Sequence, residues 1–190
     1  EAGWAISPEE CMRVFIGKTV RSEAARIEAH TGRPLTDAWM AQFYDRRNAR
    51  LEAELRAIEG AVDAVRAVHA RLGGRIACAS GADRFKVEMQ LEKVGLAPYF
   101  AGRIFSGHEM PATKPAPDVY LAAAAAVGVA PARCLVVEDT VTGVAAGVAA
   151  GATVVGYSPS PVGHGSPEAL RAAGAVHVMA DMGELLALLG

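Results

Sequence analysis

The chain has 190 residues, of which 52% are hydrophobic and 21% charged, and its formal net charge is −2. This composition fits one folded domain with a small addition, and it excludes a disordered chain. Lys and Arg are dispersed along the sequence, so no nucleic-acid partner is expected. The three cysteines are far apart, no Cys-x-x-Cys occurs, and the first residues lack a signal-peptide pattern. We therefore expect a cytoplasmic protein with reduced thiols.

The first part of the chain, residues 1–58, has the pattern of helices only. Ser7 followed by Pro8 is typical of a helix start, because Ser caps a helix and Pro fits its first turn. Further helices are predicted over residues 19–30 and from Thr36 or Asp37 onward. This part is therefore predicted to be a small α-helical domain.

The second part of the chain, residues 59–190, alternates between helical patterns and short apolar runs. Strands alternating with helices imply a parallel sheet with helices on both of its faces, which is a Rossmann-like α/β fold. The predicted strands cover residues 75–80, 103–106, 134–138, 152–156 and 175–179, and the predicted helices cover residues 62–72, 83–94, 117–127, 140–150, 167–172 and 182–189.

One segment, residues 140–166, contains no fully charged residue and has Gly143, Gly147 and Gly151 at every fourth position. Small residues at this spacing also mark contacts between transmembrane helices. The segment lacks large aliphatic side chains, and further glycines and prolines interrupt it, so no membrane span is predicted. We expect the glycines to allow a helix to pack closely on the sheet.

Polar residues follow three of the predicted strands. Ser80 and Gly81 end the first, Lys114 lies in the loop after the second, and Glu138 and Asp139 end the third. Because the carboxyl ends of parallel strands meet at one edge of a sheet, these residues are expected to lie close together. A hydroxyl with neighbouring N–H groups, a cation and an acid pair suited to Mg²⁺ together fit a phosphoryl group. Taken singly, each has an ordinary alternative as a turn residue, a surface lysine or a helix cap.

These motifs resemble those of a known family. Ser80, the run Lys114-Pro115-Ala116-Pro117-Asp118, and Glu138-Asp139 with Gly143 resemble motifs II, III and IV of the haloacid dehalogenase superfamily. The helical first part resembles the small cap of its phosphatase and β-phosphoglucomutase branch. The resemblance implies a cap over residues 1–58 and a Rossmann-like core over residues 59–190. It also implies a Mg²⁺-dependent phosphatase of a small phosphorylated metabolite, such as a sugar phosphate or a sugar-acid phosphate.

The resemblance also implies a role for each residue of the site. Ser80 with Gly81 would bind the transferring phosphate, and Lys114 would neutralise the phosphate and the nucleophile. Asp139 would bind Mg²⁺, with Glu138 as a further ligand or as the partner of one.

The helical part would contribute to substrate choice. By the resemblance, the loop that contains Gly17 and Lys18 would close over the leaving group. The expected partner is a small molecule, and the protein is expected to be a monomer or a homodimer.

The family's first motif, an Asp-x-Asp that supplies the nucleophile from a central strand, does not occur in this sequence. We therefore expect an aspartyl-phosphate to form on a residue N-terminal to this chain. Without the central strand, two ladders of backbone groups would lack partners. The isolated chain is thus predicted to be inactive and poorly soluble.

Three alternatives remain open at this point. A phosphomutase of the β-phosphoglucomutase type would share every core residue and release an isomerised sugar phosphate. The dehalogenase branch needs no metal, so the acid pair argues against it. A non-catalytic phosphate-binding or interaction protein would keep the phosphate-binding residues and lack the nucleophile altogether.

Overall fold

The computed structural model describes residues 3–15, 18, 20–159 and 165–189, and it divides the chain into two units. The first unit is Glu1–Glu54 and the second is Leu55–Gly190. The boundary therefore lies after Glu54, slightly earlier than the sequence-based boundary after residue 58.

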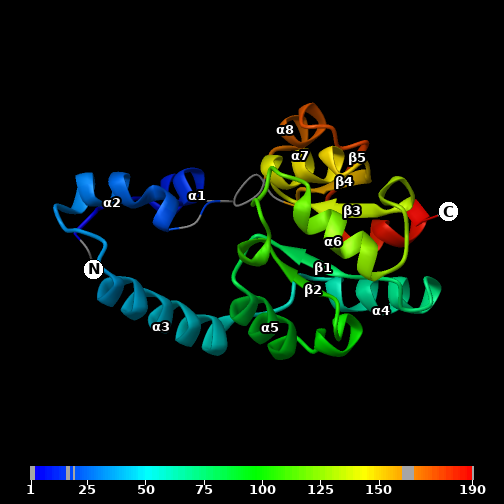
Figure 1. Cartoon of the computed structure of the whole chain (residues 1–190), viewed down its shortest axis with the longest axis horizontal. Helices are drawn as coiled ribbons and strands as arrows, with labels where there is room; N and C mark the ends of the chain where they lie inside the picture. Colours follow the sequence, from blue (N-terminus) through cyan, green and yellow to red (C-terminus); the bar gives the residue numbers. More distant parts are fainter. Residues whose placement is uncertain (1–2, 16–17, 19, 160–164, 190) are drawn as a thin grey trace. The chain divides into compact units, whose positions relative to one another are not determined.

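The described residues of the first unit form helices, as predicted. Ser7 caps the first of them, because its Oγ accepts a hydrogen bond from the N–H of Glu10 at 3.1 Å. Thr36 plays a similar part for the longest helix, since its Oγ1 accepts from the N–H of Trp39 at 3.2 Å. The elements are α1 (Pro8–Phe15), the 3₁₀ helix η1 (Arg21–Glu23), α2 (Ala24–Thr31) and α3 (Asp37–Glu54) (Figure 1).

The second unit alternates helices and strands, also as predicted. The elements, in order, are α4 (Ala61–Arg71), β1 (Cys78–Ser80), α5 (Arg84–Lys93), η2 (Ala97–Phe100), β2 (Ile104–Ser106), η3 (Gly107–Glu109), α6 (Asp118–Ala126), η4 (Pro131–Arg133), β3 (Leu135–Glu138), α7 (Val141–Ala149), β4 (Thr153–Tyr157), α8 (Pro167–Ala172), β5 (His177–Met179) and η5 (Met182–Leu189).

Several predicted elements have other bounds in the structure: α2 begins at Ala24 rather than at residue 19, and β5 begins at His177 rather than at Ala175. The first strand was expected from Arg75 but begins at Cys78, because the N–H groups of Arg75 and Ile76 are bonded to Leu72 and Gly74 in the preceding turn. The predicted last helix is present over the expected residues and is a 3₁₀ helix. Its first turn is tightened by a side chain, since the N–H of Gly183 donates to Asp181.

The strands form two parallel sheets. In the first, β1 pairs with β2, with Cys78 opposite Ile104; in the second, the order is β3-β4-β5, with Val136 opposite Val154. Helix α6 packs against β1 and β2 and also contacts α7, which in turn packs on β3 and β4. Helix α6 therefore joins the two sheets (Figure 1).

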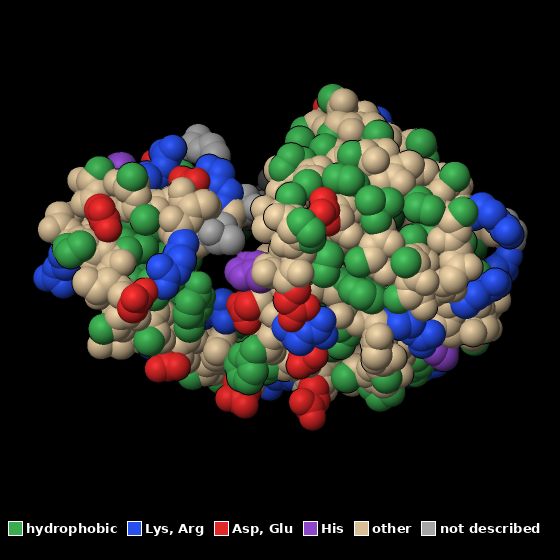
Figure 2. Space-filling view, viewed as in Figure 1, with side chains coloured by type: hydrophobic (Ala, Val, Ile, Leu, Met, Phe, Trp, Pro, Cys, Tyr) green, Lys and Arg blue, Asp and Glu red, His purple; other side chains and the backbone are tan. Residues whose placement is uncertain are grey.

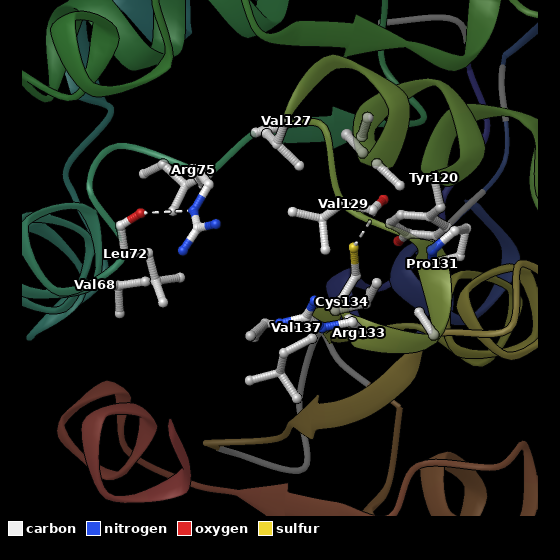
Figure 3. Close-up of a pocket in the computed structure, with 18 of the residues that line it drawn as sticks. Val68, Leu72, Arg75, Tyr120, Val127, Val129, Pro131, Arg133, Cys134 and Val137 are labelled. Atoms are coloured by element: carbon white, nitrogen blue, oxygen red, sulfur yellow. Dashed lines mark hydrogen bonds between the residues drawn. The ribbon is translucent and has the colours of Figure 1, made fainter. Parts of the chain in front are cut away.

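The facing edges of β1 and β3 border a cavity of about 630 Å³. It is lined mostly by apolar side chains, which come from α4, α6, β3, η5 and the segments 72–79 and 127–134 (Figure 3). Within the described residues, each of these two strands has a neighbour on one side only. Backbone groups of successive residues point to opposite sides of a strand. The backbone N–H of Cys78 donates to the carbonyl oxygen of Arg103, next to β2, and the carbonyl oxygen of Cys134 accepts from the N–H of Thr153 in β4. The backbone groups of Ala79, Leu135 and Val137 therefore point to the opposite sides of their strands, which are the free edges.

Gly147 allows α7 to pack closely on the sheet, as predicted, whereas Gly151 follows the helix with a φ of +82° and a Cβ there would meet no atom within 4 Å. A Cβ at Gly147 would lie 2.7 Å from Cγ2 of Val154, a fully buried residue of β4. Leu170 and Val144 complete this core with no exposed surface. None of the helices in the described ranges has the length and apolar character that a bilayer crossing requires.

The three cysteines, all described, are free and half-buried. On the face in Figure 2, Lys and Arg side chains lie among Asp and Glu over the left and lower middle of the view, and a smaller group of Lys and Arg at the right edge has no acidic neighbour there among the described residues. The expectation that no nucleic acid binds stays a prediction.

Candidate functional site

Ser80 and Gly81 form the turn that leads from β1 into α5. The Oγ of Ser80 accepts a hydrogen bond from the N–H of Ala82 at 3.1 Å, and the buried hydroxyl of Ser106, at the end of β2, donates to the carbonyl oxygen of Ala82 at 2.7 Å. A Cβ at Gly81 would meet no atom within 4 Å. The turn is thus fixed from both strands, and its Gly81 side is open to a ligand.

An exposed ion pair connects the loops that follow these two strands. Arg84, at the start of α5, donates from Nε and Nη2 to the two carboxylate oxygens of Glu109, each at 2.6 Å. Hydrogen bonds from the Arg84 guanidinium hold the pKa of Glu109 below its usual range. This bidentate pair keeps the turn after β1 beside the 3₁₀ helix η3.

Lys114 lies in the loop between η3 and α6, and its side chain is only 13% exposed. Its Nζ donates to the carbonyl oxygen of Ala79 at 3.3 Å, to the hydroxyl of Tyr120 at 2.9 Å and to Oε1 of Glu138. An ammonium carries three N–H donors, so all three have protein partners. Lys114 is therefore a mostly buried, fixed cation that joins the ends of β1 and β3.

Glu138, the last residue of β3, is 8% exposed. Its Oε1 accepts from Lys114 and from the hydroxyl of Tyr120, and its Oε2 accepts from the N–H of Asp139 and from Oγ1 of Thr140, each at 3.2 Å. A buried carboxylate is tolerated only with such partners. Its oxygens are occupied by these contacts.

The first turn of α7 is built against this carboxylate. Thr140 caps the helix, since its Oγ1 accepts from the N–H of Gly143 at 3.1 Å. A Cβ at Gly143 would lie under 3.0 Å from three atoms of the Glu138 carboxylate. Glycine is therefore required at this position for Glu138 to reach Lys114.

Asp139 follows β3 directly, is half-buried, and accepts a hydrogen bond from the N–H of Gly165 on its backbone oxygen at 2.8 Å. Its carboxylate belongs to the same strand end as Glu138. Among the described residues, no group of three or more His, Cys, Asp or Glu side chains has the arrangement of a metal site. The predicted pair therefore supplies at most two carboxylates, one of which, Glu138, is already engaged by Lys114.

Of the predicted residues, the structure brings together Lys114 and Glu138 by direct contact and places Ser80 next to Ala79, which Lys114 also contacts. The sequence did not single out Tyr120, whose hydroxyl lies between the two charges. The one sequence signal was an aromatic residue in an alanine-rich helix close after Lys114, a signal shared by many core positions.

Two predicted substrate residues belong to the first unit. Lys18 forms an ion pair with Glu23 at 3.1 Å, and its side chain is half-exposed. Gly17 lies outside the described residues. Their predicted role stays a prediction.

Comparisons with known proteins identify the family of this chain. A model of the haloacid dehalogenase-like hydrolase family matches residues 4–151. The chain is 29% identical over 168 residues to the 6-phosphogluconate phosphatase of Escherichia coli, covering 88% of this chain and 73% of that protein.

Two crystal structures give the same result. A haloacid dehalogenase-like protein of unknown function from Agrobacterium tumefaciens superposes with a TM-score of 0.81 at 34% identity, over 99% of this chain and 84% of that one. A HAD family hydrolase from Deinococcus radiodurans, with bound phosphate and sodium, superposes with a TM-score of 0.74 at 32% identity, over 92% of this chain and 76% of that one. The chain therefore belongs to the haloacid dehalogenase-like hydrolase family.

Proposed function

We propose that this protein is a phosphatase of small phosphorylated metabolites, with a sugar phosphate or sugar-acid phosphate as its substrate. The observation that carries the proposal is the position of Lys114, whose ammonium is held at the meeting point of the ends of β1 and β3. A fixed cation in a water-poor position stabilises the charge of a phosphoryl group far better than a cation in bulk water. The name of the Escherichia coli relative, a 6-phosphogluconate phosphatase, supports this substrate class.

In this proposal the turn after β1 binds the phosphate together with Lys114. Ser80 provides a hydroxyl, and the open backbone at Gly81 admits a phosphate oxygen. The bound phosphate of the Deinococcus radiodurans relative supports a phosphate site in this fold.

Mg²⁺ is the proposed cofactor, with Asp139 as its ligand from this chain. Mg²⁺ in phosphoryl-transfer sites is held by one or two carboxylates together with waters and substrate phosphate, so the donor set fits the ion through Asp139 alone. When bound, the ion would neutralise phosphoryl charge. Glu138 would act on Lys114 rather than on the metal, because its oxygens already accept hydrogen bonds.

The nucleophile is proposed to be an aspartate that is not among these 190 residues, and the first unit is proposed to act as the substrate-selecting cap. In this arrangement the chain described here supplies phosphate binding, charge neutralisation and one metal ligand. The attack on phosphorus and the hydrolysis of the aspartyl-phosphate take place on that additional residue.

Binding of inorganic phosphate, measured by isothermal titration calorimetry with and without Mg²⁺, tests the roles of the two charged residues separately. Asp139→Asn should remove the gain in phosphate affinity that Mg²⁺ provides, and Lys114→Ala should weaken phosphate binding in both conditions. Asp63→Asn, an exposed carboxylate on α4 with a side chain 83% exposed, is the matched control and should change neither. A Mg²⁺ effect that survives in Asp139→Asn would refute the metal assignment.

Activity of the complete protein is measured as release of inorganic phosphate from 6-phosphogluconate and a panel of hexose phosphates. Free phosphate is the expected product. An isomerised sugar phosphate without phosphate release would instead indicate a phosphomutase.

A further inference from the structure

A buried tyrosine, Tyr120, lies between the two charged groups of the site and has no part in the proposed function so far. Its hydroxyl accepts from Nζ of Lys114 at 2.9 Å and donates to Oε1 of Glu138. The ammonium also lies 4.7 Å from the centre of the ring, within the range of a cation–π interaction. Tyr120 is therefore in contact with Lys114 through both its hydroxyl and its ring.

The three partners of the ammonium differ in kind. Glu138 is an opposite charge, the Tyr120 hydroxyl lies at 2.9 Å, and the Ala79 carbonyl is a neutral acceptor at 3.3 Å. Hydrogen bonds weaken with distance, and those between ionised groups are the strongest. The contact with Ala79 is thus the weakest of the three, so an incoming anion replaces it at the lowest cost.

The protonation state of Tyr120 fixes the direction of its hydrogen bonds. Burial and the nearby negative charge of Glu138 raise the pKa of Tyr120 well above its usual value. The hydroxyl therefore keeps its proton at neutral pH, donates it to Glu138 and offers a lone pair to Lys114. Because Glu138 accepts from both groups, the three side chains form a closed triangle of hydrogen bonds.

We propose that Tyr120 is a positioning residue for Lys114. Together with Glu138 it holds two N–H groups of the ammonium, so that the third, which lies on the Ala79 carbonyl, is the one that a phosphate oxygen takes. This inference rests on the proposed function, since it takes Lys114 as a phosphate-binding cation. It extends that function by assigning the direction from which phosphate meets the lysine.

Inorganic phosphate in the presence of Mg²⁺ is the probe, and calorimetry gives its affinity. Tyr120→Phe keeps the ring and removes only the hydroxyl, so we expect phosphate affinity to fall by about tenfold, the scale of one hydrogen bond to a charged group. The matched control is Tyr157→Phe, because Tyr157 is a buried tyrosine of β4 outside the site. The affinity of the Tyr157→Phe variant for phosphate should equal that of the wild type.

A double-mutant cycle separates positioning from a general structural role. In a Lys114→Met background, Tyr120→Phe should have no further effect, since the hydroxyl acts through the ammonium. An equal loss of affinity in both backgrounds would overturn the proposal. If Lys114→Met weakens phosphate binding and Tyr120→Phe does not, the proposal fails while the proposed function stands; if Lys114→Met has no effect, both fail.

If the Tyr120→Phe variant does not fold, nitrogen-15 NMR of the Lys114 ammonium in the wild-type protein tests whether this ammonium is held in place. Slow exchange of its N–H protons with water, together with a shift of the signal on addition of phosphate, supports the proposal. An ammonium that exchanges as fast as a surface lysine overturns it.

Discussion

Gly143→Ala is the substitution whose effect follows most directly from the packing of α7. The new Cβ would lie under 3.0 Å from three atoms of the Glu138 carboxylate, and the carboxylate would have to leave its place. Lys114, with a side chain only 13% exposed, would then lose its counter-charge. Breaking a buried ion pair costs about 3–5 kcal/mol.

An opposing effect reduces this loss. Replacing glycine by alanine inside a helix favours the helix by about 1 kcal/mol. We therefore expect Gly143→Ala to lower the free energy of unfolding by about 2–4 kcal/mol, as measured by urea denaturation followed by circular dichroism.

The cause is tested in a background that lacks the carboxylate. In Glu138→Ala, the collision is absent, so Gly143→Ala should be neutral or should stabilise the protein by up to about 1 kcal/mol. Gly147→Ala is the comparison, because its Cβ would crowd Val154 at 2.7 Å without contacting the charged groups, and its cost should be the same in both backgrounds. The reasoning is refuted if Gly143→Ala destabilises both backgrounds equally.

Three further predictions concern other parts of the second unit. Arg84 lowers the pKa of Glu109, so their ion pair stabilises the fold above the unfolded-state pKa near 4.5 and this stability is lost as pH falls through the lower folded-state pKa. The difference in melting temperature between the wild type and Glu109→Gln should therefore shrink on acidification. A difference that stays constant with pH would contradict this. Burial raises the pKa of the Cys78 thiol, so 5,5′-dithiobis(2-nitrobenzoate) at pH 8 should modify Cys78 more slowly in the folded protein than in urea. Equal rates of modification in the two conditions would contradict this prediction. An extended peptide of about five apolar residues, flanked by lysines, should raise the melting temperature of the protein by pairing with the free edges of β1 and β3. A matched peptide with a central proline, which lacks an N–H donor, should not raise it. Equal effects of the two peptides would rule out strand pairing.

The parts of the fold that depend on local sequence were predictable. Ser7 and Pro8 marked the first helix because a cap acts on the N–H groups of the next turn. Lys114 and Glu138 were expected to lie close together because parallel strands bring their carboxyl ends to one edge. The structure brings them together, but their direct ion pair was not predicted.

Other features depend on contacts between distant residues. Tyr120 has the pattern of a core aromatic in an alanine-rich helix, and only the folded chain brings its hydroxyl to Lys114 and Glu138. The start of β1 was predicted too early because Arg75 and Ile76 fit a strand by their side chains, while their N–H groups are used in a turn. Periodicity reports on side chains and does not report on such backbone bonds.

The cap of α7 has a consequence for how this region opens. The hydroxyl of Thr140 accepts from the N–H of Gly143 and donates to Glu138, so one oxygen atom ties the start of a helix to the buried carboxylate. Fraying of that first turn would therefore also remove one of the hydrogen bonds that Glu138 accepts, so the two events are coupled rather than independent. The start of α7 and the charged site are therefore coupled through this one hydroxyl, and loss of the Thr140 hydroxyl would weaken both.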